Sequence, residues 1–383
     1  MIRKILSSIL LAATVTVSAQ TERFSVATLN VDGLPRKILF LNINADGPGP
    51  EGSLHIGQYL AGKDYDLVFT QEDFNYHAEL TLPLQCGYHF DTWSGGISLL
   101  GKKIDLLHLQ NLRFDCDGLG AAWKKGTCVE SVSRTAWNDV FGKFSHANDE
   151  LATKGFRRYE LKLPSGLQLV AYNLHMDAGD DTDEKNGNDL GDRMARRGEW
   201  RQLLDDLLPR LDERPVVIVG DMNSYYCRDG IEQDFIGVIN ATGIATAHDV
   251  WVDLVKRGIY PAPVDDIAYS EAGGYELDGE TLDKIIYINP VDGIQIKPLE
   301  CSIDTEGYLH DGKPLGDHYP LAATFEVTCD LSGGTSGMEA VATGTTTARE
   351  LYDLSGRRVV GSARKGLYIE HQGGKTMRKR VIK

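Results

Sequence analysis

The sequence repeats one pattern in which a short apolar run, of the kind that forms a buried strand, stops at a chemically active polar residue. Residues 24–30 (FSVATLN) alternate in hydrophobicity and end at Asn30, and residues 215–220 (PVVIVG) lead directly into Asp221. Such runs are typical of strands. A single case would mean little, because polar residues commonly form the turn after a strand. The pattern recurs, and the other residues at or beside strand ends are Glu72, His175, Asp283, Asp317 and His318.

A helix is predicted between two of these strands. Within residues 192–208, Trp200, Leu203 and Leu207 fall on one face at helical spacing, and Pro209 should end the helix. Strands mixed with a few helices over about 300 residues indicate an α+β body with packed sheets. The strand ends can then meet along one edge of that body and form a single site.

The residue types at these ends suit the hydrolysis of a phosphoester. Glu72, Asn30 and Asp317 offer oxygen ligands without sulfur, which favours Mg²⁺, Ca²⁺ or Mn²⁺ over a structural zinc. His175 and His318 can exchange protons near neutral pH. A hard cation, a histidine base and amide donors together favour attack of water on phosphorus.

The N-terminus is predicted to be an export signal, and the C-terminus a separate basic segment. Residues 1–19 (MIRKILSSILLAATVTVSA) have a basic start, an apolar run and a small-residue cleavage site, as in a secretory signal peptide. Their apolar run is shorter than the roughly 20 residues that span a bilayer. Residues 330–345 have the composition of a flexible linker, and residues 346–383 predict a small β-module or a basic tail on a solvated face. Export would make disulfides expected among the six cysteines, in pairings that the sequence leaves open.

The charge of the chain is unevenly spread. The N-terminus carries +2 and residues 346–383 carry +7; subtracting both from the net −15 leaves −24 for the middle. A body this acidic repels polyanions, which argues against a sequence-nonspecific DNA-coating protein. Arg193, Arg196 and Arg197 cluster on the predicted helix, and the acidic residues nearby predict a self-neutralised surface face.

Six segments, taken in order, resemble the endonuclease/exonuclease/phosphatase superfamily over roughly residues 24–327. Each segment alone is common, whereas the ordered set is specific. The resemblance implies a four-layered, DNase-I-like α/β sandwich of two packed sheets flanked by helices, with a catalytic domain over residues 20–329. The segments are LNVDG (Asn30), TQEDF (Glu72), YNLHMD (His175), GDMNS (Asp221, Asn223), LDKIIY (Asp283) and GDHYPL (Asp317, His318).

The resemblance also implies how a cation and water would be held. Glu72, helped by Asn30, would bind Mg²⁺, with Ca²⁺ or Mn²⁺ as alternatives, and Asp317 would be a further metal ligand. Asp221 and Asn223 would position the nucleophilic water and a phosphate oxygen.

The resemblance further implies roles for the two histidines of the site. His318, oriented by Asp283, would be the general base, although Asp221 is the alternative for that role. His175 would stabilise the pentavalent phosphorus or assist the leaving group.

Two further segments resemble sphingolipid-hydrolysing enzymes. Residues 149–156 (DELATKGF) are similar to an Asp…Lys-Gly-Phe element of sphingomyelinases, which implies that Asp149 and Lys154 bind substrate. Residues 71–77 (QEDFNYH) resemble a secreted phospholipase C subgroup, so His77 is expected to bind substrate as well. The acidic body would tolerate a zwitterionic head group.

The resulting hypothesis is a secreted, monomeric, Mg²⁺-dependent phosphodiesterase. It would hydrolyse sphingomyelin or a related phosphosphingolipid at a membrane surface to ceramide and a phospho-head group, and would form no stable nucleic-acid complex. The tail resembles type IX sorting signals, which implies secretion to, or display on, the outer surface of a Gram-negative bacterium. The alternatives are an extracellular DNase-I-like endonuclease and a catalytically inactive surface binding protein.

Overall fold

The computed structural model describes residues 22–38, 41–97, 111–143, 146–179, 190–262 and 280–329, and the strands within 350–382. The chain divides into two compact units, Met1–Leu331 and Ser332–Lys383. The predicted signal peptide (1–19) and linker (330–345) lie outside the described residues. In the described part of the chain, no helix is long and apolar enough to cross a membrane.

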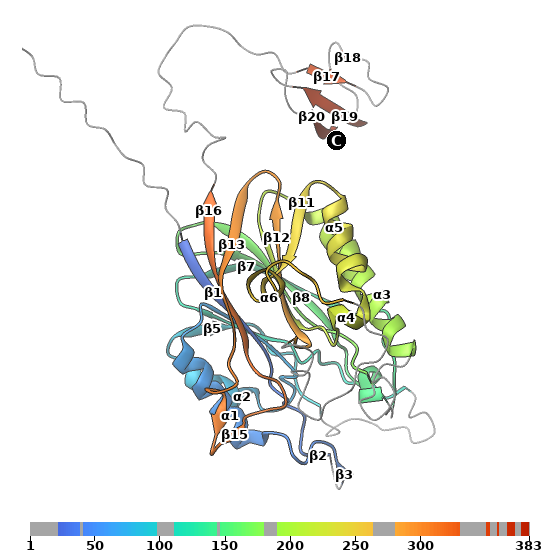
Figure 1. Ribbon diagram of the computed structural model, residues 1–383. Coiled ribbons are helices and arrows are strands. Elements are labelled where there is room, and N and C mark those ends of the chain that lie inside the picture. Colours follow the sequence, from blue (N-terminus) through green and yellow to red (C-terminus); the bar gives the residue numbers. More distant parts are fainter. Residues whose placement is uncertain are drawn as a thin grey trace, which may run out of the picture. The chain divides into compact units, whose positions relative to one another are not determined.

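The first unit is built on two six-stranded mixed sheets (Figure 1). The first has the order β13-β16-β1-β4-β6-β5 and the second β11-β12-β10-β9-β8-β7. The first sheet comprises β1 (Glu22–Asn30), β4 (Leu67–Gln71), β5 (Tyr88–Phe90), β6 (Gly120–Lys124), β13 (Ile294–Ile303) and β16 (Leu321–Cys329). The second comprises β7 (Cys128–Ala136), β8 (Gly155–Lys162), β9 (Gln168–His175), β10 (Val216–Asp221), β11 (Ala245–Asp249) and β12 (Asp283–Pro290).

Helices flank the sheets, and apolar cores lie between the two sheets and on their outer faces. Phe69 and Val219 belong to the core between the two sheets. Leu60 packs with Leu29 on the outer face of the first sheet, and Trp200 packs on the outer face of the second. This layering confirms the predicted α+β sandwich. The helices are α1 (Gly49–Lys63), α2 (His77–Thr81), α3 (Leu190–Leu207), α4 (Tyr226–Asp229), α5 (Gly237–Ala241) and α6 (Val250–Leu254); the short hairpins are β2 (Lys37–Ile38) with β3 (Leu41–Asn42) and β14 (Leu309–His310) with β15 (Lys313–Pro314).

Helix α3 corresponds to the predicted helix and ends at Leu207, where a short 3-10 turn that contains Pro209, Leu208–Arg210, begins. Its arginines do not all lie on the surface. Arg193 and Arg197 are exposed, whereas Arg196 is buried, so the prediction of a self-neutralised surface cluster is wrong for Arg196. Arg196 faces the sheet because it lies one helical turn before Trp200.

The strand register aligns the ends that carry the polar residues. In the second sheet Asp221 pairs with His175 on the parallel strand β9 and with Asp283 on the antiparallel strand β12. In the first sheet Asn30 pairs with Gln71. Gln71 Nε2 donates to Asn173 Oδ1 across the core at 2.7 Å, so a buried hydrogen bond joins the two sheets just behind these ends.

The cysteines whose side chains the structure describes do not support the predicted disulfides. Cys86, Cys128, Cys227 and Cys301 carry free thiols. The first two are exposed, whereas burial raises the pKa of Cys227 to about 11 and that of Cys301 to about 12. A buried thiol in apolar surroundings is held in its unreactive protonated form.

The second unit contains a four-stranded antiparallel sheet in the order β18-β17-β19-β20. Its strands are β17 (Glu350–Tyr352), β18 (Arg358–Val359), β19 (Gly366–His371) and β20 (Met377–Ile382). The sorting role of this segment stays a prediction.

Candidate active site

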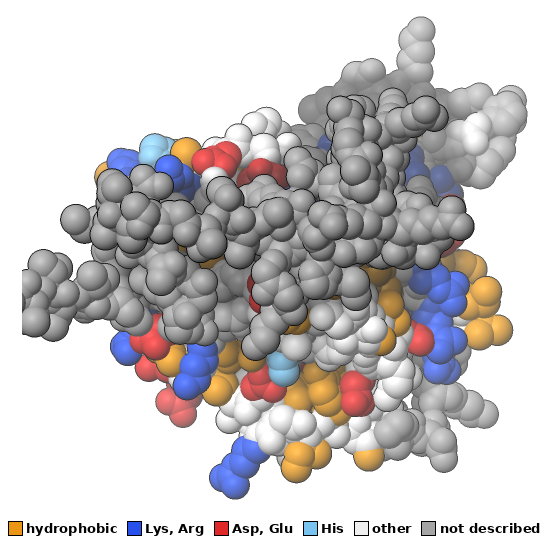
Figure 2. All heavy atoms as spheres, turned by 90° about the horizontal axis from the view of Figure 1, so that it is seen from above, with side chains coloured by type: hydrophobic (Ala, Val, Ile, Leu, Met, Phe, Trp, Pro, Cys, Tyr) orange, Lys and Arg blue, Asp and Glu red, His pale blue; other side chains and the backbone are white. Residues whose placement is uncertain are grey.

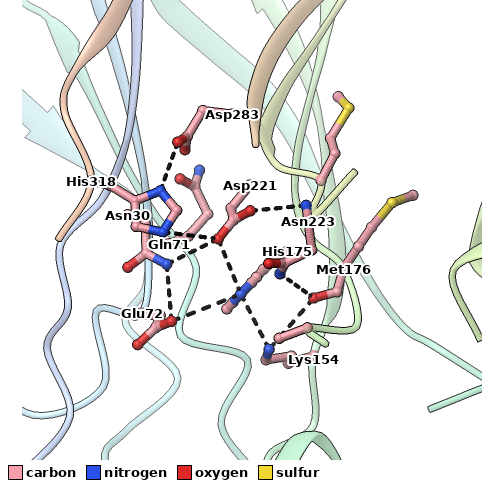
Figure 3. Close-up of polar contacts among 12 residues, drawn as sticks. Asn30, Gln71, Glu72, Lys154, His175, Met176, Asp221, Asn223, Asp283 and His318 are labelled. Atoms are coloured by element: carbon pink, nitrogen blue, oxygen red, sulfur yellow. Dashed lines mark hydrogen bonds and ion pairs between the residues drawn. The ribbon is translucent and has the colours of Figure 1, made fainter. Parts of the chain in front are cut away.

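The aligned strand ends bring most of the predicted residues into one cluster (Figure 3). Four lie at the ends of β1, β9, β10 and β12, one follows β4, and one lies shortly before β16. In chain order they are Asn30, Glu72, His175, Asp221, Asp283 and His318.

His318 and Asp283 form a hydrogen-bonded pair. His318 Nδ1 lies 2.7 Å from Asp283 Oδ2, and Nε2 lies 3.7 Å from Asp221 Oδ2. Burial lowers the pKa of His318, but the carboxylates of Asp283 and Asp221 outweigh burial and hold this pKa well above its ordinary value. The pair thus fixes the ring with Nε2 facing the rest of the cluster.

Asn30 joins the two sheets within the cluster. Its Nδ2 donates to Glu72 Oε1 at 2.9 Å and to Asp221 Oδ2 at 3.1 Å. Glu72 has a left-handed backbone with φ of 55°, a strained conformation that is common at functional sites. Burial and the neighbouring Asp317 raise the pKa of Glu72 to about 7.

Asp221 is held as a carboxylate at the centre of the cluster. Burial would raise its pKa, but His318, together with the hydrogen bonds from Asn30 and Asn223, outweighs burial and keeps this pKa below its ordinary value. The Asn223 backbone N–H donates to Asp221 Oδ1 at 2.9 Å. Asn223 Nδ2 donates to the carbonyl of Met176 at 3.0 Å, so this side chain ties the turn after β10 to the turn after β9.

His175 is buried and neutral. Lys154 Nζ lies 3.2 Å from His175 Nε2, which must therefore accept the hydrogen bond, because an ammonium group can only donate. Burial and the charge of Lys154 lower the pKa of His175 well below its ordinary value. Lys154 also forms a buried ion pair with Asp149. The predicted Asp149–Lys154 element therefore reaches the cluster through His175.

Relatives of known type match most of the chain. The sphingomyelinases of Mycobacterium bovis and Mycobacterium tuberculosis are each 25% identical over 314 residues, covering 80% of this chain and 53% of theirs. The chain thus spans about half the length of the curated relatives that it matches. A crystal structure of humanized D. rerio TDP2 has a TM-score of 0.51 at 16% identity, covering 79% of this chain and 98% of that one. D. rerio TDP2 complexed with single strand DNA product gives a TM-score of 0.51 at 15% identity and the same coverage. The likeness to these solved structures shows a shared fold. No protein-family model matches the chain.

Two residues predicted for the site lie at its margin. Asp317 is exposed, and its charge raises the pKa of Glu72. His77 begins α2, where its Nδ1 lies 2.5 Å from Asp73 Oδ2 and its ring stacks on Trp93. Neither contact of His77 is with the cluster, so its role in substrate binding stays a prediction.

Asp32 is a member of the site that sequence reasoning missed. Its backbone N–H donates to Asn30 Oδ1 at 3.0 Å, and its carboxylate accepts from Asn44. Burial, Asp317 and Glu72 raise its pKa to about 8. The available signal was its place two residues after Asn30, in the turn of LNVDG.

The donor set fits a hard divalent cation. Asp221, Asp283 and His318 offer ligand atoms within 4.8 Å of one another, but His318 Nδ1 is already occupied by Asp283. Burial, together with neighbouring carboxylates, raises the pKa of Glu72 and of Asp32, and a cation would relieve the repulsion between the carboxylates. Oxygen donors of this kind suit Mg²⁺ or Ca²⁺.

Proposed function

We propose that this chain is a metal-dependent phosphodiesterase that hydrolyses sphingomyelin or a related phosphosphingolipid to ceramide and a phospho-head group. The supporting observation is the cluster itself. It combines the His318–Asp283 pair, an ionised Asp221 and the buried Lys154–His175 contact in a chain that is 25% identical to curated sphingomyelinases.

Water activation would be the task of His318. Asp283 holds Nδ1, which leaves Nε2 to take a proton from a water that Asp221 orients. Asp221 itself is the weaker candidate for the base, because a carboxylate whose pKa is lowered binds a proton poorly. Asn223 would hold a phosphate oxygen beside that water.

Lys154 and His175 would stabilise the negative charge that develops on the phosphorane. Lys154 Nζ carries a buried positive charge, and His175 lies between it and Asp221. In a low-dielectric site such a fixed charge stabilises the transition state more than it does in water. Lys154 is fixed before substrate arrives, because Asp149 and His175 already hold it.

Glu72 and Asn30 would hold Mg²⁺, with Asp317 as a further ligand and Ca²⁺ or Mn²⁺ as alternatives. When bound, the cation neutralises charge on the phosphate oxygens. Glu72 suits this role because its pKa of about 7 leaves a carboxylate ready to ionise when a cation binds.

A lipid substrate is favoured over DNA by charge. The chain carries a net charge of −15, and removal of the two basic ends would make the body more acidic still. Nucleic-acid affinity depends on Lys and Arg contacts to phosphates, whereas a zwitterionic head group tolerates acidic surroundings. The proposed enzyme is secreted or displayed on the outer cell surface and acts at a membrane.

A parallel assay tests this function. The purified protein is given sphingomyelin vesicles and plasmid DNA, each with Mg²⁺ or with EDTA, and His318→Ala serves as the control. The expected result is phosphocholine release that EDTA abolishes, Mg²⁺ restores and His318→Ala lacks. Nicked plasmid beside intact lipid would instead identify a nuclease, and inactivity towards both substrates would favour a binding protein.

A further inference from the structure

Helix α3 carries two charged side chains that the sheet buries. Arg196 is 1% exposed and Glu199 is fully buried, although both residue types are rarely buried without a partner. By contrast the next residue, Arg197, has a side chain that is 56% exposed and pairs with Asp234 at the surface. Arg196 and Arg197 therefore form a natural comparison on one helix.

Both buried residues hold the turn that follows β9. Glu199 Oε2 accepts from the backbone N–H of Asp177 at 3.0 Å, and Arg196 Nη1 donates to the carbonyl of Asp177 at 3.2 Å. Asp177 lies two residues after His175. Helix α3 thus binds both the backbone N–H and the backbone carbonyl of Asp177.

Arg196 also connects to the turn that follows β10. Its Nη2 donates to Asp229 Oδ1 at 3.2 Å. Asp229 Oδ2 accepts from the Tyr225 N–H at 2.8 Å and from Arg228 Nε at 2.7 Å. Arg228 Nη2 in turn donates to the carbonyl of Asn223 at 3.0 Å. Because Asn223 Nδ2 already bonds the turn after β9, these contacts close a ring between the two strand ends.

We propose that Arg196 is a positioning residue that fixes the spacing between His175 and Asn223. The proposal rests on the proposed phosphodiesterase function only for its kinetic consequence. A planar guanidinium can donate in two directions at once, here to Asp177 and to Asp229, whereas a lysine ammonium is a single point charge. Loss of either hydrogen bond of Arg196 would let the distance between the two turns increase. Misplacement of catalytic groups by about 1 Å can cost about 10²-fold in rate.

The test compares matched substitutions on one helix. Arg196→Lys and Arg196→Met are assayed with a soluble chromogenic phosphodiester in Mg²⁺, beside Arg197→Lys and Arg197→Met. We expect kcat to fall by about tenfold or more for Arg196→Lys and further for Arg196→Met, with KM within about twofold of wild type. Both Arg197 variants should match wild type. A wild-type kcat in folded Arg196→Lys would overturn the proposal.

A destabilised control separates positioning from stability. Leu203→Ala, on the same helix, removes a buried apolar side chain that takes no part in the ring. It should lower the melting temperature at least as much as Arg196→Lys while keeping kcat per folded molecule. If Leu203→Ala lost kcat in the same proportion, Arg196 would have only a structural role.

A spectroscopic readout and a second variant keep the test independent of turnover. The imidazole NMR signals of His175, assigned with His175→Ala, should shift in Arg196→Lys and stay unchanged in Arg197→Lys. Asp229→Asn breaks the ring at its other side and should shift the same signals, which provides the answer if Arg196 variants fail to fold. Unchanged signals in both would overturn the proposal. If the wild type cleaves no phosphodiester, the proposed function fails and these signals still decide the role of Arg196.

Discussion

At the residue scale, the protonation of His318 depends on Asp283. The Asp283 carboxylate holds the pKa of His318 above its ordinary value, and a general base works only in its neutral form. The rate should therefore rise with pH as His318 loses its proton. Asp283→Asn removes the charge, lowers the pKa of His318 and moves this rising limb to lower pH. The maximal rate should nevertheless fall by about 10²-fold or more, because the ring loses its orientation.

The pH profile of kcat with a soluble phosphodiester measures this effect. Asp253→Asn is the matched control, because Asp253 pairs with His248 at 3.6 Å outside the cluster. Asp253→Asn should leave the position of the rising limb of the pH profile and the maximal kcat unchanged. If the rising limb of the pH profile occurred at the same pH in Asp283→Asn as in the wild type, His318 would not be the titrating base.

At the element scale, the close pairing of β9 and β10 depends on Gly220. This residue has φ of 145°, and an added Cβ would lie 2.0 Å from the carbonyl oxygen of Leu174. Gly220→Ala should push apart the strand ends that carry Asp221 and His175. We expect a loss of several kcal/mol in unfolding free energy, of the order seen for overpacked interiors and strained backbone, and a fall in kcat of the folded fraction.

Chemical denaturation together with kcat per folded molecule tests this prediction. Gly243→Ala provides the comparison, since Gly243 also has positive φ (68°) but has open space around its Cβ position. It should cost only about 1 kcal/mol and leave kcat unchanged. Similar effects of the two substitutions would mean that strand spacing at Gly220 has no special importance.

The same elements explain what the sequence could predict. The strands were visible because apolar runs end at Asn30, Glu72, His175 and Asp221. The parallel pairs β1 with β4 and β9 with β10 bring these C-terminal ends together. Some contacts of the site cannot be predicted from apolar runs or sequence motifs. The contact of Lys154 with His175 depends on how β8 begins beside β9, which no local pattern encodes.

The error at Arg196 has a clear physical origin. Arg196 was assigned to the surface by its charge, although its spacing of four residues from Trp200 placed it on the buried face. His77, in the same QEDFNYH segment as Glu72, stays a predicted substrate-binding residue. The chain turns at Glu72, where φ is positive, and His77 contacts Asp73 and Trp93.

At the scale of the whole molecule, charges of both signs mix on the visible surface (Figure 2). Several acidic side chains, Asp177 and Glu199 among them, are buried. Burial raises the pKa of Asp177, as of Asp32, to about 8, and that of Glu72 to about 7. An acid with a raised folded pKa holds its proton more tightly in the folded chain than in the unfolded one. Its ionisation therefore favours unfolding, and stability is lost as pH rises towards 7 to 8.

Thermal unfolding should reveal this dependence. In EDTA, at constant ionic strength, the midpoint should fall between pH 6.5 and 8.5, and the raised pKa of His318 acts in the same direction. Asp221, with its lowered pKa, acts in the opposite sense, but only under acidic conditions outside this window. Mg²⁺ should raise the midpoint, and more at pH 8.5 than at pH 6.5, because it binds the folded form and needs ionised ligands.

Glu72→Gln separates the site from the rest of the surface. In EDTA, the thermal midpoint of Glu72→Gln should fall less with rising pH, because the substitution removes a carboxyl group with a raised pKa. The substitution should also remove most of the rise in midpoint that Mg²⁺ causes, because it removes a metal ligand. Glu51→Gln makes the same change of charge on an exposed residue of α1 and should leave both effects intact. A midpoint that rose with pH in EDTA would show that these carboxylates ionise freely in the folded chain. An equal Mg²⁺ gain in the wild type and Glu72→Gln would mean that the cation binds elsewhere.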